Sequence, residues 1–135
     1  MKKAFILMEY LMGMAVLALM MGLLLFSYRV VLDRVTLGNE AYAVKRYMEY
    51  ARDYANTRQQ TVTFQIKNKG IELVDATGKV LNRHVYSKIV IITGPTFYFT
   101  PNLTPSMGVT ETISVGRLSK KVIVDPSTGR IRISG

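Results

Sequence analysis

The residue types that support enzyme chemistry are scarce in this sequence. There is one histidine, His84, and no cysteine, so the usual nucleophile–base pairs and the nitrogen or sulfur metal clusters cannot be assembled. The glycines lack the GxGxxG and GKT spacings of phosphate-binding loops, and no helix-turn-helix or RNA-binding signature is found. We therefore expect no enzyme, no metal and no cofactor, and we expect His84 to lie on the surface.

One acidic residue, Glu9, lies at the start of an apolar run. The next 19 residues, Tyr10 to Tyr28, carry no charge, which is close to the roughly 20 residues that cross a bilayer as a helix. Lys2 and Lys3 precede this span, so the positive-inside bias keeps the N-terminus in the cytoplasm and sends the rest of the chain outward. The following "YRVVLDRV" offers no small-x-small cleavage site, which argues against an ordinary secretory signal.

An acid just inside an apolar helix costs on the order of 2 to 3 kcal/mol on insertion scales and usually has a functional partner. The stretch "KKA" followed by "FILMEYL" resembles the type IV prepilin signal, with cleavage between Ala4 and Phe5 and glutamate as the fifth mature residue. The resemblance implies a prepilin peptidase that cuts on the cytoplasmic side, methylation of the new amine, and a helix that stays attached. Glu9 would then pair with the amino terminus of Phe5 on a neighbouring subunit. The alternative is a plain single-pass anchor with Glu9 at headgroup depth.

An apolar stripe extends the predicted helix beyond the membrane span. Its members repeat at spacings of four and three: Leu37, Ala41, Val44, Met48, Ala51 and Ala55. We expect one helix from Phe5 to about Arg58, roughly 80 Å long at 1.5 Å per residue. The expected organisation is a leader at 1–4, a transmembrane and assembly segment at 5–28, an amphipathic extension at 29–58 and a β-rich domain at 59–135.

From Thr61 the apolar period changes to two, and short β-type runs follow. They are "TVTFQI", "IELV", "KVLN", "KIVII", "TFYFT", "VTETISV", "KVIV" and "RIRI". Turn residues separate several of them, with "DPSTG" joining the last two as a hairpin and "PNLTPSMG" forming an exposed loop. The predicted fold class is α+β, a small antiparallel sheet that buries its apolar face on the helix stripe.

Basic residues gather near the C-terminus of a chain whose formal net charge is +9. The segment from Arg117 to Arg132 holds one acid, Asp125, and five basic residues, Arg117, Lys120, Lys121, Arg130 and Arg132. As a strand, "GRIRI" would bury its isoleucines and project both arginines from one face about 6.6 Å apart, a spacing that can grip successive phosphates. The alternative is a terminal strand whose charges keep a sheet edge soluble.

The soluble part is similar to the H-type (GspH) pseudopilins of type II secretion and to FimT-like and ComGD-like minor pilins. In "YARDYANTRQQTVTFQI" the matching residues are Ala51, Arg52, Ala55, Arg58, Val62 and Phe64. FimT-like pilins that bind DNA carry a similar Gly-Arg-x-Arg near the C-terminus, which Gly129, Arg130 and Arg132 match.

These resemblances imply a minor pilin or pseudopilin of an envelope-spanning filament, held by a single membrane pass with its C-terminal domain outside the cytoplasm. The implied partners are prepilin peptidase, other pilins, membrane lipid and double-stranded DNA contacted through its backbone. The preferred setting is a competence pilus for DNA uptake. The alternatives are a type II secretion pseudopilus and, in a different class, a single-pass DNA-binding receptor that does not assemble.

Overall fold

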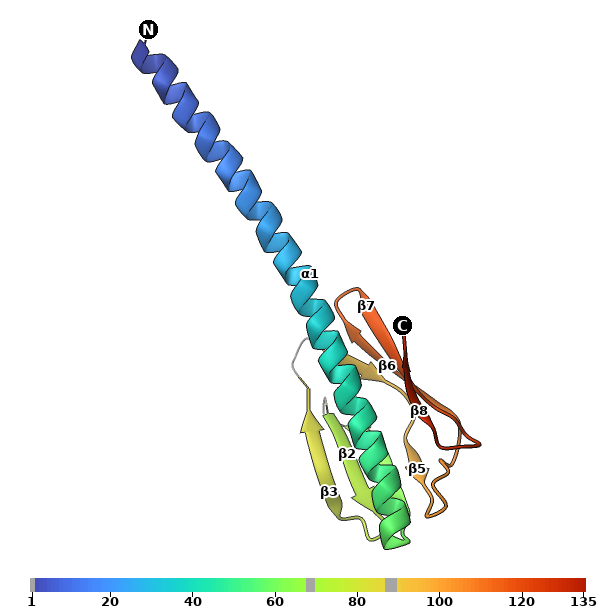
Figure 1. Ribbon diagram of the computed structural model, residues 1–135. Helices are drawn as coiled ribbons and strands as arrows, with labels where there is room; N and C mark the ends of the chain where they lie inside the picture. The colour runs from blue at the N-terminus through green and yellow to red at the C-terminus, as the bar shows by residue number, and fades with distance from the viewer. Residues whose placement is uncertain (1, 68–69, 87–89) are drawn as a thin grey trace. The chain divides into compact units, whose positions relative to one another are not determined.

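The computed structural model describes residues 2–67, 70–86 and 90–135, and it divides into two units, residues 1–33 and 34–135. Helix α1, Lys2–Arg58, forms the first unit and begins the second (Figure 1). The side chains of residues 2–4 are outside the described part, and with them that of the predicted cleavage residue Ala4.

The first unit is an apolar helix with exposed side chains. Every side chain from Phe5 to Leu32 is exposed within this unit. Among the described residues, one helix is long and apolar enough to cross a membrane, and its candidate span begins at Phe5. Such a surface is stable in lipid or against other helices, because in water its apolar area would favour burial.

The part of α1 in the second unit is amphipathic. All six stripe residues are buried, with Leu37 4% exposed and Ala41, Val44, Met48, Ala51 and Ala55 at 0%, so the predicted core face is confirmed. The helix ends at Arg58, and the next residue, Gln59, adopts a positive φ of 51°. The amide of Gln60 donates to the carbonyl of Ala55, which satisfies a carbonyl at the helix end.

In the described residues after the helix there are eight strands, and each overlaps a predicted run. They are β1 Val62–Lys67, β2 Gly70–Asp75, β3 Val80–Val85, β4 Val90–Thr93, β5 Phe97–Phe99, β6 Val109–Val115, β7 Leu118–Val124 and β8 Ile131–Ser134. All pairings are antiparallel, and the α+β fold class is confirmed.

The strands form two four-stranded sheets where one was predicted. Their orders are β3-β2-β1-β5 and β4-β6-β7-β8. Successive strands β4 and β5 fall in different sheets, and the segment between them contains Gly94 and Pro95, which favour a change of chain direction. Strand β5 pairs with β1, where Phe97 lies opposite Phe64 and Phe99 opposite Val62.

One core joins the helix stripe to both sheets. The rings of Phe64 and Phe97 lie 5.1 Å apart and those of Phe97 and Phe99 5.3 Å apart, and all three are buried. Strand β6 buries every second residue, and its buried face contains Glu111 among valines and isoleucine. Because the buried set runs from Leu37 to Ile131, this core lies entirely within the second unit.

The predicted loop "PNLTPSMG" is only partly exposed. Pro105 is buried and forms an isolated bridge with Phe99, and the amide of Ser106 donates to the carbonyl of Tyr98. The loop therefore folds back on strand β5, because a proline ring can fill an apolar site beside the edge of a sheet.

Candidate functional site

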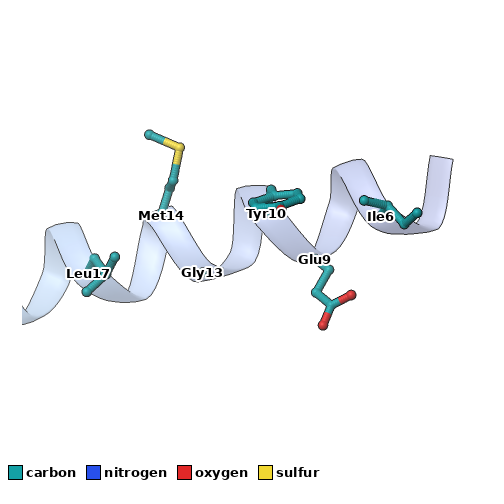
Figure 2. A pocket seen from close by; sticks show the side chains of 6 residues that line it. All are labelled: Ile6, Glu9, Tyr10, Gly13, Met14 and Leu17. Carbon is teal, nitrogen blue, oxygen red and sulfur yellow. The ribbon is translucent and has the colours of Figure 1, made fainter. Parts of the chain in front are cut away.

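The first candidate site surrounds Glu9 on the apolar helix. Glu9 lines an open hollow with Ile6, Tyr10, Gly13, Met14 and Leu17, and Figure 2 shows its carboxylate projecting from the helix. Gly13, one turn further along, leaves open space beside it. None of these six lining residues is basic, so a carboxylate in this hollow could accept a cationic group from outside the unit.

Phe5 lies one turn before Glu9 on the same helix, with its side chain 75% exposed. Cleavage before Phe5, which the prepilin signal predicts, would leave a free amine at this residue. A helix N-terminus also carries partial positive charge, which favours an anionic partner near it.

The second candidate site is the outward face of strands β7 and β8. Ile131 is buried and Ile133 is half-buried, whereas Arg130 and Arg132 are exposed, as the alternation predicted. Lys121 pairs in register with Ser134 and therefore lies on the same face as Arg132.

The neighbouring lysine is on the other face of the sheet. Lys120 lies opposite Ile113, which is fully buried, and is itself half-buried. Arg117 is exposed in the two-residue turn between β6 and β7, where Gly116 has a φ of 59°. This turn is at the opposite end of β7 from Arg130, roughly 23 Å away at 3.3 Å per residue. Of the five predicted basic residues, the sheet thus brings together Lys121, Arg130 and Arg132, which we call the basic face.

Asp125 is the acid beside the basic face. Its carboxylate accepts hydrogen bonds from the hydroxyl of Ser127 at 2.7 Å and the amide of Ser127 at 2.9 Å. These bonds, chiefly the one from the hydroxyl, hold the pKa of Asp125 below its usual range, and Arg132 also contributes. Asp125 is therefore ionised at neutral pH and fixes the β7–β8 turn, while its charge offsets part of the nearby Arg132 charge.

The β7–β8 turn is held to the helix by Arg52. Its Nη1 donates to the carbonyl of Gly129 at 3.3 Å, and the amide of Gly129 donates to the carbonyl of Asp125. Gly129 has a φ of 63°, and an added Cβ would overlap the carbonyl oxygen of Leu103. Arg52 and Gly129 were each singled out in the sequence, but their contact across 77 residues was not predicted.

His84 is not the simple surface residue that was predicted. Its Nε2 lies 3.1 Å from Oε2 of Glu40 on α1, and its side chain is 29% exposed. The rings of Tyr47 and Tyr86 lie 5.3 and 5.1 Å from it. The prediction was wrong because a strand residue can face the helix, where a partner carboxylate satisfies its polar ring.

Within the described part of the chain, no group of three or more His, Cys, Asp or Glu side chains could hold a metal ion. Both candidate sites are instead built from charges that face outward: a carboxylate on an apolar helix, and cations on the outer face of a sheet. These arrangements can pair with another subunit or with a polyanion.

Comparison with known proteins agrees with this geometry. No protein-family model matches the sequence, and no curated protein matches it significantly. The structure is similar to two crystal forms of the type IV minor pilin FimU of Pseudomonas aeruginosa strain PAO1, with TM-scores of 0.65 and 0.63 at 20% sequence identity. The first match covers 76% of this chain and 91% of FimU, and the second covers 73% and 93%. The protein therefore has the fold of a type IV minor pilin, in which one long N-terminal helix packs on antiparallel sheets.

Proposed function

We propose that the protein is a minor pilin subunit of a type IV-like filament that takes up DNA. The observation that carries the proposal is the minor-pilin fold in a chain whose apolar N-terminal helix bears Glu9 four residues after Phe5. In this proposal prepilin peptidase cleaves after Ala4, the helix remains in the membrane with the C-terminal domain outside the cytoplasm, and Glu9 pairs with the amine of a neighbouring Phe5.

A subunit of a type II secretion pseudopilus would have the same fold, the same cleavage and the same membrane helix with its Glu9 pairing. The test therefore combines deletion of the gene with shearing of surface filaments from cells that express the full chain. We expect the processed chain to co-sediment with sheared filaments, and we expect the deletion to abolish transformation while protein export continues. Loss of export with normal transformation would assign the protein to a pseudopilus. A chain found only in the membrane fraction would contradict filament assembly and favour a single-pass receptor.

We also propose that the basic face binds double-stranded DNA through its phosphates. Support comes from Lys121, Arg130 and Arg132, which are exposed on one side of the sheet with one neighbouring acid, Asp125. Contacts of this kind are independent of base sequence and weaken steeply with salt, because their energy comes mainly from counterion release. Arg117 could add a contact at the far end of β7. Lys120, on the opposite face, is expected to contribute least.

The test titrates the full chain in detergent with duplex DNA at two salt concentrations. Replacing Arg130 and Arg132 together by glutamine should weaken binding and reduce the slope of log K against log salt by about 2, one phosphate contact for each arginine. Lys121→Gln and Lys120→Gln form a matched pair, since the two residues are adjacent and carry the same charge. We expect Lys121→Gln to weaken binding and Lys120→Gln to leave it nearly unchanged. A double arginine variant with the parent's affinity and slope would make the arginine pair structural.

A further inference from the structure

Glu111 is a buried carboxyl group. Its side chain is 0% exposed, and neither carboxylate oxygen has a hydrogen-bond partner among the residues that the structure describes. Glu72 provides the contrast in the other sheet, where one oxygen lies 3.4 Å from Nε of Arg83 and the other accepts from Nε2 of Gln65 at 3.3 Å. A buried carboxylate that is neither paired nor hydrogen-bonded is costly, so the neutral acid is the form that suits this site.

The exposed residue Gly94 lies directly against this carboxyl at the edge of the sheet. Strand β4 pairs with β6 up to Thr93 and Thr112, so the next position, Gly94, lies beside Glu111. An added Cβ at Gly94 would overlap the Glu111 carboxylate, although Gly94 itself is exposed to solvent. Strand β4 is also the edge strand of its sheet among the described strands, where it pairs with β6. Displacement of this end of the edge strand would therefore expose the carboxylate to water.

The charged groups around Glu111 do not neutralise it. On β7 its opposite neighbour is Val122, and the basic residue on that face, Lys120, lies opposite Ile113 and forms no salt bridge with it. The titratable group whose pKa responds to Glu111 is the phenol of Tyr86, and its own hydroxyl is buried with no hydrogen-bond partner among the described residues. Burial, then Glu40 and Glu111, raise the pKa of Tyr86, so the phenol stays neutral. Tyr47 of α1 also raises the pKa of Tyr86.

We propose that protonation of Glu111 controls whether the end of strand β4 stays paired with the sheet. With the carboxyl neutral, Gly94 closes over it and the end of β4 stays paired. Ionisation draws water to the carboxylate and opens the segment from β4 to Gly94. The inference concerns the folded domain alone and stands whether or not the protein assembles into a filament.

The direction of the pH effect follows from burial. Burial raises the pKa of Glu111 from 4.5 to about 7, so between these values the closed state binds more protons than the open state. The stability of the closed state relative to the open state is therefore greatest below pH 4.5 and falls as the pH rises toward 7. Above pH 7 this stability changes little. Between pH 5.5 and 8.0 this linkage predicts a roughly 25-fold increase in the open fraction.

The test measures hydrogen exchange of the full chain in detergent at pH 5.5 and 8.0, with the intrinsic pH dependence of exchange divided out. We expect protection of the amides of β4 and Gly94 to fall by roughly 10- to 30-fold at the higher pH. Glu111→Gln should remove this dependence, whereas the matched variant Glu72→Gln should retain it. The same dependence in Glu111→Gln and the parent would overturn the proposal.

A second measurement needs no variant. The side-chain carboxyl carbon of Glu111, followed by NMR in the parent protein, should titrate with a midpoint near 7. A midpoint near 4.5 would overturn the proposal, because the carboxylate would then ionise freely in the folded domain.

Discussion

At the scale of single residues, Glu9 is the one acid between Phe5 and Tyr28, and none of the described residues that line the hollow around it is basic. Replacing Glu9 by valine removes the cost of inserting an acid, so insertion should be unchanged or improved. Incorporation into filaments should fall about tenfold or more if the carboxylate pairs with a neighbour's amine. Quantitative blotting of membranes and of sheared filaments checks both. Met8→Val, the adjacent apolar change, serves as control, and normal incorporation of Glu9→Val would leave the acid without an assembly role.

Gly129 is the residue on which the β7–β8 turn depends. Gly129→Ala should destabilise the protein by about 2 kcal/mol or more, because alanine strains a positive φ and its Cβ would overlap the carbonyl of Leu103. Gly78→Ala is the matched control, since Gly78 has a φ of 84° but open space around it. That variant should cost only about 1 kcal/mol. Thermal unfolding of both measures the difference, and equal costs would mean that the Leu103 contact is easily relieved.

At the scale of elements, the fit between α1 and the sheets depends on small side chains. Ala51 is fully buried, so Ala51→Leu should overpack the core and destabilise the protein by about 1 to 3 kcal/mol. Ala43→Leu has the same effect on helix propensity but adds its bulk to an open hollow beside Tyr42 and Tyr47, and should change stability by less than about 0.5 kcal/mol. Denaturant unfolding compares the two. Similar stabilities would show that the helix shifts to accept the larger residue.

At the scale of the whole molecule, the "KKAFILMEY" start predicts a mature chain that begins at Phe5. Loss of Lys2 and Lys3 would lower the formal net charge from +9 to +7. Mass spectrometry of protein from cells with an active prepilin peptidase should find this chain with a methylated amine. Cells without the peptidase supply the control, in which Met1 should remain. A retained Met1 in both would exclude prepilin processing.

The sequence by itself determined the elements and their buried faces. The stripe from Leu37 to Ala55 and the period-two runs predicted the core side of the helix and the strands, because that choice depends on local spacing. The same alternation also predicts that Glu111 is buried, because Glu111 shares its face of the strand with Val109 and Ile113. It likewise predicts that Lys120 faces inward, because Lys120 shares its face with Val122.

Tertiary structure decided which elements meet. The contact of Arg52 with Gly129 joins residues 77 apart and that of His84 with Glu40 joins residues 44 apart. The division of the strands into two sheets likewise depends on β5 pairing with β1. Local periodicity states which face of an element is buried but not which distant residue lies against it. That choice is made by packing of the whole core, because backbone hydrogen bonds and side-chain volumes must be satisfied together.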